Sequence, residues 1–198
     1  GTDNDPKEDL YEACYPGQQG SDDIAPEMKE RRREQLTLDA LEDLIVHLRG
    51  LREERKAVLM VSEGWRLFAE NRRLTRAISG RGASLGPDVF RRGRGGEPAP
   101  RPANGATRVD LNECEADRVA LSLMNNSRRV RDLTDAANRG NVSFYPVYPR
   151  GLAVFDAPIG PDRPPALAVD RANLAARQDA LRELAGNTDG LAVVNTND

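Results

Sequence analysis

The best candidate for chemistry is a short polar turn, Ser62-Glu63-Gly64, which directly follows an apolar run. In open α/β sheets, ligands bind just beyond the carboxyl ends of the strands. A carboxylate and a hydroxyl group at that position can hold a hard cation such as Mg²⁺ through their oxygen atoms. The same three residues also occur simply as a turn, so both interpretations stay open. We place Arg150, which follows a second apolar run, in the same candidate binding site.

The sequence gives little support for enzymatic catalysis. Its Gly-x-Ser-x-Gly match, Gly82–Gly86, lies within the basic insertion described below and does not follow a predicted strand, and the single histidine, His47, lies off the apolar stripe of a predicted helix. The glycines of Arg91–Gly96 do not follow a strand, so they do not form a phosphate-binding loop. The carboxylates are scattered along helices, where solvated faces are the usual explanation. We therefore expect a binding protein and not an enzyme.

A basic stretch runs from Arg72 to Arg101 and holds eight arginines against two acidic residues. It is rich in glycine and proline, and we predict a flexible insertion over residues 80–107. Its arginines could pair with phosphates, which makes polyanion or nucleic-acid binding the alternative function. Phe90 is the only aromatic residue in the stretch, so few side chains are available to stack on nucleic-acid bases. A solvated linker is the simpler interpretation.

The two cysteines, Cys14 and Cys114, do not form a Cys-x-x-Cys motif, and His47 is distant in sequence. These facts argue against a zinc site. Two unrelated reduced thiols and one disulfide both remain open. We predict the disulfide, provided that the protein is exported.

Composition and charge limit the function further. Hydrophobic residues make up 38% and charged residues 31% of the 198 residues, and the net charge is −3. This near-balanced charge does not favour a nucleic-acid partner. No apolar run is long enough to span a membrane.

The elements that position these residues alternate between strands and helices. The apolar spacing predicts a helix over residues 26–50, and continuous apolar runs predict strands that are covered on both faces. Residues 1–25 are predicted to be rich in loops. The strands are expected at 55–62, 141–148 and 190–195, and the helices between them at 117–139 and 171–187.

This order is that of βαβ units, which predicts parallel strands. The sequence resembles von Willebrand factor A-like domains of bacteria in three blocks. The first is the helix end and strand that lead to Glu63-Gly64, the second is Ala136–Val147, and the third is Arg182–Ala192. The resemblance implies a single domain over residues 1–198 with a doubly wound, three-layer, mostly parallel sheet, incomplete at its amino end. In the family's strand order, residues 141–148 would lie in the middle, where Pro146 is unfavourable.

The resemblance also implies a function. The family has a metal-ion-dependent adhesion site, and only its aspartate after the fourth strand has a counterpart here, at Glu63. The Asp-x-Ser-x-Ser motif is not in the sequence, so a Mg²⁺ site would need residues from outside it. We expect protein recognition or adhesion by a secreted protein, extracellular or periplasmic. We also expect self-association if the edge of the strand at 55–62 is unpaired.

Overall fold

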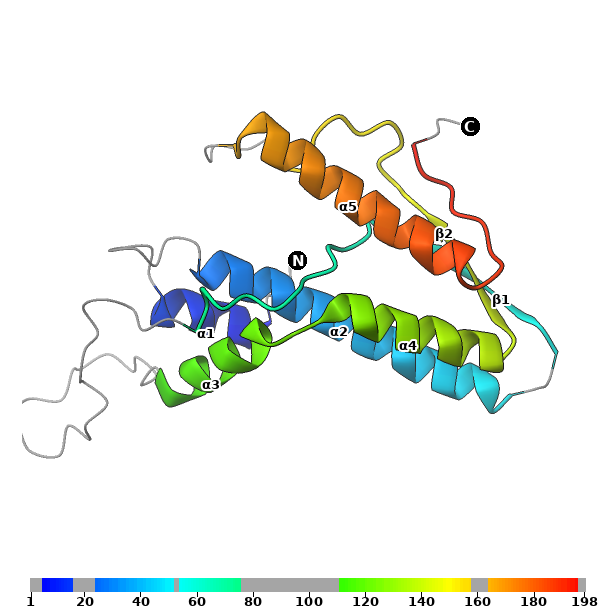
Figure 1. Cartoon of the computed structure of the whole chain (residues 1–198), viewed down its shortest axis with the longest axis horizontal. Coiled ribbons are helices and arrows are strands. Elements are labelled where there is room, and N and C mark those ends of the chain that lie inside the picture. Colours follow the sequence, from blue (N-terminus) through cyan, green and yellow to red (C-terminus); the bar gives the residue numbers. More distant parts are fainter. Residues whose placement is uncertain (1–4, 16–23, 52–53, 76–110, 158–163, 196–198) are drawn as a thin grey trace, which may run out of the picture. The chain divides into compact units, whose positions relative to one another are not determined.

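The computed structural model describes residues 5–15, 24–51, 54–75, 111–157 and 164–195 (Figure 1). The arginine-rich segment 80–107 lies outside these described residues. The chain forms two compact units. The first consists of Gly1–Arg31 and Asn71–Leu123, and the second of Arg32–Glu70 and Met124–Asp198.

The first unit contains helices α1 (Pro6–Cys14) and α3 (Leu111–Ser122) and the start of α2 (Ile24–Arg49). The loop-rich prediction for residues 1–25 is therefore wrong for α1. Its amino end has the chemistry of a helix start, because the Asp5 side chain accepts a hydrogen bond of 3.0 Å from the Lys7 amide. Pro6 occupies the first helical position, where no amide hydrogen is needed. By contrast, α2 confirms the helix predicted at 26–50.

A partly buried polar contact and a cysteine pair connect α1 to α3. The Tyr11 hydroxyl donates to the Asp117 carboxylate over 2.9 Å, and the Lys7 ammonium lies 2.8 Å from the same carboxylate. This hydrogen bond with Asp117 is the main cause that raises the pKa of Lys7. Cys14 and Cys114 are fully buried and joined as a disulfide, with Cα atoms 6.5 Å apart, which is inside the range for such a bond.

The second unit contains the rest of α2, strands β1 (Lys56–Val61) and β2 (Val142–Val147), and helices α4 (Asn126–Arg139) and α5 (Leu167–Gly186). The two strands pair in parallel, with Lys56 opposite Val142 and Val61 opposite Val147. This pairing confirms the parallel sheet and the α/β class. The described sheet has two strands, and Val193 adds a parallel bridge to Val147 on the far side of β2 from β1.

Pro146 explains why the third predicted strand, 190–195, is reduced to a bridge. The backbone amide and carbonyl groups of the even-numbered residues of β2 point toward the C-terminal segment. There the Val193 amide donates to the Pro146 carbonyl over 2.8 Å, and the Tyr148 amide donates to the Val193 carbonyl over 2.9 Å. Pro146 has no amide hydrogen to continue this ladder. The Phe144 amide instead donates to the Thr188 hydroxyl, over 3.1 Å. The ladder therefore does not extend from the bridge toward Leu191. On the other side of the bridge, Asn195 has a φ of 57°, which is not an extended conformation.

One face of the sheet carries the core of the second unit. The side chains of Val142 and Phe144 are almost fully buried against apolar residues from three helices. The main contributions are Leu38, Leu41 and Ile45 from α2, Val130, Leu133 and Ala137 from α4, and Leu181 and Leu184 from α5. Consecutive strands in this order place their crossover helices on the same face, so α4 and α5 cover one side together.

The helix predicted at 117–139 is two helices. It is interrupted at Asn125, whose side chain accepts a hydrogen bond of 3.2 Å from the Arg128 amide and so starts α4 anew. Beyond this break, Arg129 holds α4 to α2 through its hydrogen bond of 2.7 Å to Glu42. This bond is the main cause that raises the pKa of Arg129 above its ordinary value.

Removing the disulfide should loosen the first unit selectively. We expect the double variant Cys14→Ser/Cys114→Ser to lose up to about 4.7 kcal/mol of unfolding free energy, the chain-entropy value for a loop of about 100 residues. Hydrogen exchange read by mass spectrometry should then accelerate in Pro6–Cys14. Peptides from α4 and β2 serve as the internal control and should change little. Unchanged protection of α1 would contradict the role given to the disulfide.

Candidate functional site

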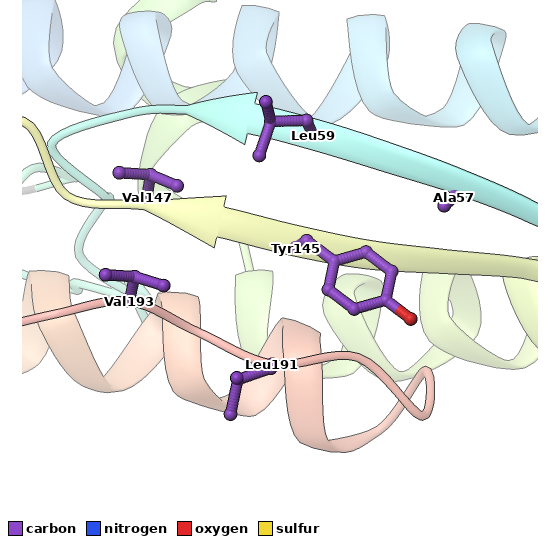
Figure 2. A pocket seen from close by; sticks show the side chains of 6 residues that line it. All are labelled: Ala57, Leu59, Tyr145, Val147, Leu191 and Val193. Carbon is purple, nitrogen blue, oxygen red and sulfur yellow. The ribbon is translucent and has the colours of Figure 1, made fainter.

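The second unit presents an apolar sheet surface that no described helix covers. Odd-numbered residues of both strands point to this side, and Leu59, Val61 and Leu191 are 73%, 67% and 68% exposed. Six of its side chains line a shallow hollow of about 470 Å³, and Figure 2 shows them on the side of the strands away from the helices. We call this surface the open face. It consists of Ala57, Leu59, Val61, Tyr145, Val147, Leu191 and Val193.

The open face corrects the sequence prediction that the strand at 55–62 is covered on both sides. In the described chain, β1 alternates between half-buried and exposed residues. Val58 and Met60 pack against the core, whereas Leu59 and Val61 face outward. The sequence shows no alternation because both sets are apolar. A contiguous set of apolar residues on the uncovered side of a parallel sheet is a sign that another layer packs there.

The predicted site residues Ser62, Glu63, Gly64 and Arg150 come together at the carboxyl end of the sheet. The Ser62 hydroxyl accepts a hydrogen bond of 3.0 Å from the Gly64 amide, which closes the turn after β1. The Glu63 carboxylate is 59% exposed and lies 3.8 Å from the Arg150 guanidinium. Arg150 also donates to the carbonyl oxygens of Phe155 and Asp156, over 2.7 and 3.1 Å. Arg150 thus links the turn after β1 to the loop after β2.

Three residues that the sequence analysis did not select hold this loop to α5. Arg177 forms an ion pair of 2.9 Å with the Asp156 carboxylate and reaches the Gly64 carbonyl. Asp170, near the start of α5, accepts the amides of Asp156 and Ala157 over 3.1 and 2.8 Å. The only signal in the sequence is the presence of charged residues near strand ends, since their partners are distant along the chain.

Ser62 and Glu63 do not fit a Mg²⁺ site by themselves. Glu63 brings a single carboxylate, and its nearest charged partner is the cation Arg150. The Ser62 oxygen already accepts a hydrogen bond within the turn. Across the described ranges, no three His, Cys, Asp or Glu residues gather as a metal would require. The geometry therefore supports a structural turn with an ion pair.

Tyr148 lies beneath this polar cluster. Its side chain is 4% exposed, and burial is the main cause that raises the pKa of its phenol. The neighbouring Arg150 acts in the opposite direction and favours the phenolate. Burial prevails, so the pKa of the Tyr148 phenol lies above its ordinary value.

A second charged group limits the open face at the amino end of the strands. The Arg55 side chain crosses the sheet, where it donates to the Ser143 hydroxyl and to the Asp189 carbonyl, each over 3.0 Å. Ser143 is on the same side as the open face and is almost fully buried. The apolar surface therefore lies between Arg55 at one end and the pair of Glu63 and Arg150 at the other.

Comparisons with known proteins do not identify a relative. No protein-family model, no curated protein and no solved structure matches the chain. In the part of the chain that the structure describes, no helix is both long and apolar enough to cross a membrane. Of the arginines singled out in the basic stretch, the structure describes only Arg72 and Arg73.

Gly64 should tolerate no side chain. Its φ angle is +73°, and a Cβ atom there would lie 2.2 Å from the Arg177 carbonyl oxygen. We expect Gly64→Ala to lower the unfolding free energy by at least about 2 kcal/mol, because strain and steric overlap add. Gly186→Ala is the matched control, since nothing lies within 4 Å of its added Cβ. Denaturant titration followed by the fluorescence of Trp65, the only tryptophan, measures both. Equal midpoints for the two variants would contradict the close packing of Gly64.

Proposed function

We propose that this chain is a protein-recognition module of the von Willebrand factor A-like type, and that the open face is its recognition surface. The observation that carries the proposal is the exposure of branched apolar side chains on a parallel sheet. Six of these side chains line one common hollow. Large contiguous apolar patches of this kind mark interaction sites on soluble proteins.

The architecture supports an amphipathic helix as the partner element. Parallel sheets occur almost only where helices cover both faces. In this chain α2, α4 and α5 pack on one face. A partner helix on the open face would supply the second helical layer of the three-layer fold, and its apolar stripe would replace water over Leu59, Leu191 and Val193.

The charged groups at the two ends of the open face would form a polar rim around such an interface. Arg55 lies at the amino end and Glu63 with Arg150 at the carboxyl end, and all three are at least partly accessible. Rim charges direct encounter and orientation more than they add affinity. Because Glu63 pairs with Arg150, the proposal gives Glu63 the role of a rim charge and not of a metal ligand.

The disulfide supports a location outside the cytoplasm. Disulfides persist in oxidising compartments and are rare in the cytosol. Cys14 and Cys114 are both inaccessible to solvent, so the bond is a structural one in this fold. An extracellular or periplasmic recognition protein fits this chemistry. Polyanion binding through Arg72–Arg101 remains a prediction, because most of that segment lies outside the described residues.

Site-specific photocrosslinking tests the proposal. A photoreactive amino acid at Leu191, in the full chain incubated with extract from its source, should give a discrete adduct with another polypeptide. The substitution Val193→Lys should reduce that adduct at least tenfold, because a buried charge is costly in an apolar interface. The matched control places the same probe at Val46, which is 67% exposed on α2 and lies outside the open face. Equal adducts from both positions, or no adduct from Leu191, would contradict the proposal.

A further inference from the structure

The outer edge of β1 is a second candidate surface for interaction, and it is distinct from the open face. The Lys56 amide donates to the Asn141 carbonyl over 2.7 Å, and the Ser62 amide donates to the Val147 carbonyl over 3.1 Å. These two contacts fix which residues face β2. Because hydrogen-bonding direction alternates along a strand, the even-numbered residues of β1 bind β2 and the odd-numbered ones point their amide and carbonyl groups outward.

Three consecutive outward positions are available for pairing. The backbone groups of Ala57, Leu59 and Val61 have no hydrogen-bond partner among the described residues. An edge strand is normally protected by a charged residue, a proline or a bulge. Residues 57–61 contain none of these, and the only lysine of β1 directs its ammonium to the Gly140 carbonyl, over 3.0 Å. This edge is thus able to accept another strand.

The charges at the two ends of β1 favour a second copy of the same strand in antiparallel orientation. At the amino end, the two cations Arg55 and Lys56 outnumber the single acid Glu54, and Glu63 follows the carboxyl end. If two copies pair antiparallel with Leu59 opposite Leu59, Arg55 of each copy lies opposite Glu63 of the other. A parallel arrangement would instead place like charges side by side, which is destabilising.

We infer that two copies of this chain associate through their β1 edges, around a two-fold axis at Leu59. Ala57 then pairs with Val61 of the second copy, and the three outward residues of each strand exchange backbone hydrogen bonds. The axis is perpendicular to the sheet, so both open faces lie on the same side. The pair forms one continuous sheet with a doubled apolar surface. The inference rests on the edge alone and does not require the partner helix proposed above.

Cysteine crosslinking tests the register. In a hydrogen-bonded antiparallel pair, opposite Cα atoms are about 5.5 Å apart, which a disulfide can span. We expect Leu59→Cys to form a covalent dimer under mild oxidation, whereas Val61→Cys alone should give at least tenfold less. Mixing Ala57→Cys with Val61→Cys chains should restore the dimer. The native cysteines do not interfere because both are fully buried. Equal crosslinking by all these variants, or none by Leu59→Cys, would overturn the inference.

A proline at the same position tests the edge without crosslinking. The Leu59 amide points away from β2, so Leu59→Pro removes an outward donor and no hydrogen bond within the chain. Sedimentation should show the wild type as a dimer and Leu59→Pro as a monomer, with at least a tenfold higher dissociation constant. Leu59→Ala is the control that keeps the amide. A Leu59→Pro chain that sediments as a dimer would overturn the inference, and Trp65 fluorescence verifies its fold.

Charge reversal tests the orientation and separates this inference from the proposed function. Glu63→Arg should weaken the dimer several-fold, and Arg55→Glu in the same chain should restore it. The double variant also replaces the partners of Arg150 and Asp189 within the chain by residues of like charge. Its thermal stability is therefore measured as well, to verify that the variant is folded. Loss without restoration in a stably folded double variant would contradict the antiparallel pairing. In the photocrosslinking experiment at Leu191, the mass of the adduct distinguishes another polypeptide from a second copy of this chain. If no such adduct forms, the proposed function fails but the dimer measurements still stand.

Discussion

The parallel ladder between β1 and β2 is the interaction on which the second unit depends. It joins two segments that are more than eighty residues apart in sequence, in the register that sets Val58 opposite Phe144. That register places one set of alternating side chains in the core with α2, α4 and α5, and the other set on the open face. It also leaves the odd-numbered backbone groups of β1 pointing outward. The apolar surface and the open edge are therefore two consequences of one pairing.

The same ladder positions the polar cluster at the carboxyl end of the sheet. The turn after β1 and the loop after β2 emerge side by side, which brings Glu63 to Arg150. Gly64 packs on the backbone of α5 at Arg177, and Arg177 in turn holds Asp156. These contacts make the cluster a structural connection that holds the two loops to α5. We call this connection the clasp. They also explain why a turn that could bind a metal in isolation contains an ion pair here.

Much of the second unit could be predicted from the sequence, because helical apolar spacing and short apolar runs are local signals. The predictions of the long helix α2 and of parallel pairing between β1 and β2 are confirmed. Asp5 and Pro6 also encode the start of α1 locally, and Asn125 encodes the start of α4. The sequence prediction contained neither helix start. The covered and open faces could not be distinguished, because both faces of β1 are apolar. The clasp could not be predicted either, since Arg177 and Gly64 meet only after the chain has folded.

Solvent access to individual methyl groups tests most directly whether the sheet is covered on one face only. Methyl NMR with a soluble paramagnetic agent should show strong relaxation enhancement at Leu59 and Leu191, which are 73% and 68% exposed. Leu181 and Leu184, which are fully buried on the covered face, should be unaffected under the same conditions. Dimerisation through the β1 edge would leave the face itself accessible, so the contrast should persist at high concentration. Protection of Leu59 and Leu191 equal to that of Leu181 and Leu184 would show that another layer covers the sheet and would contradict the account.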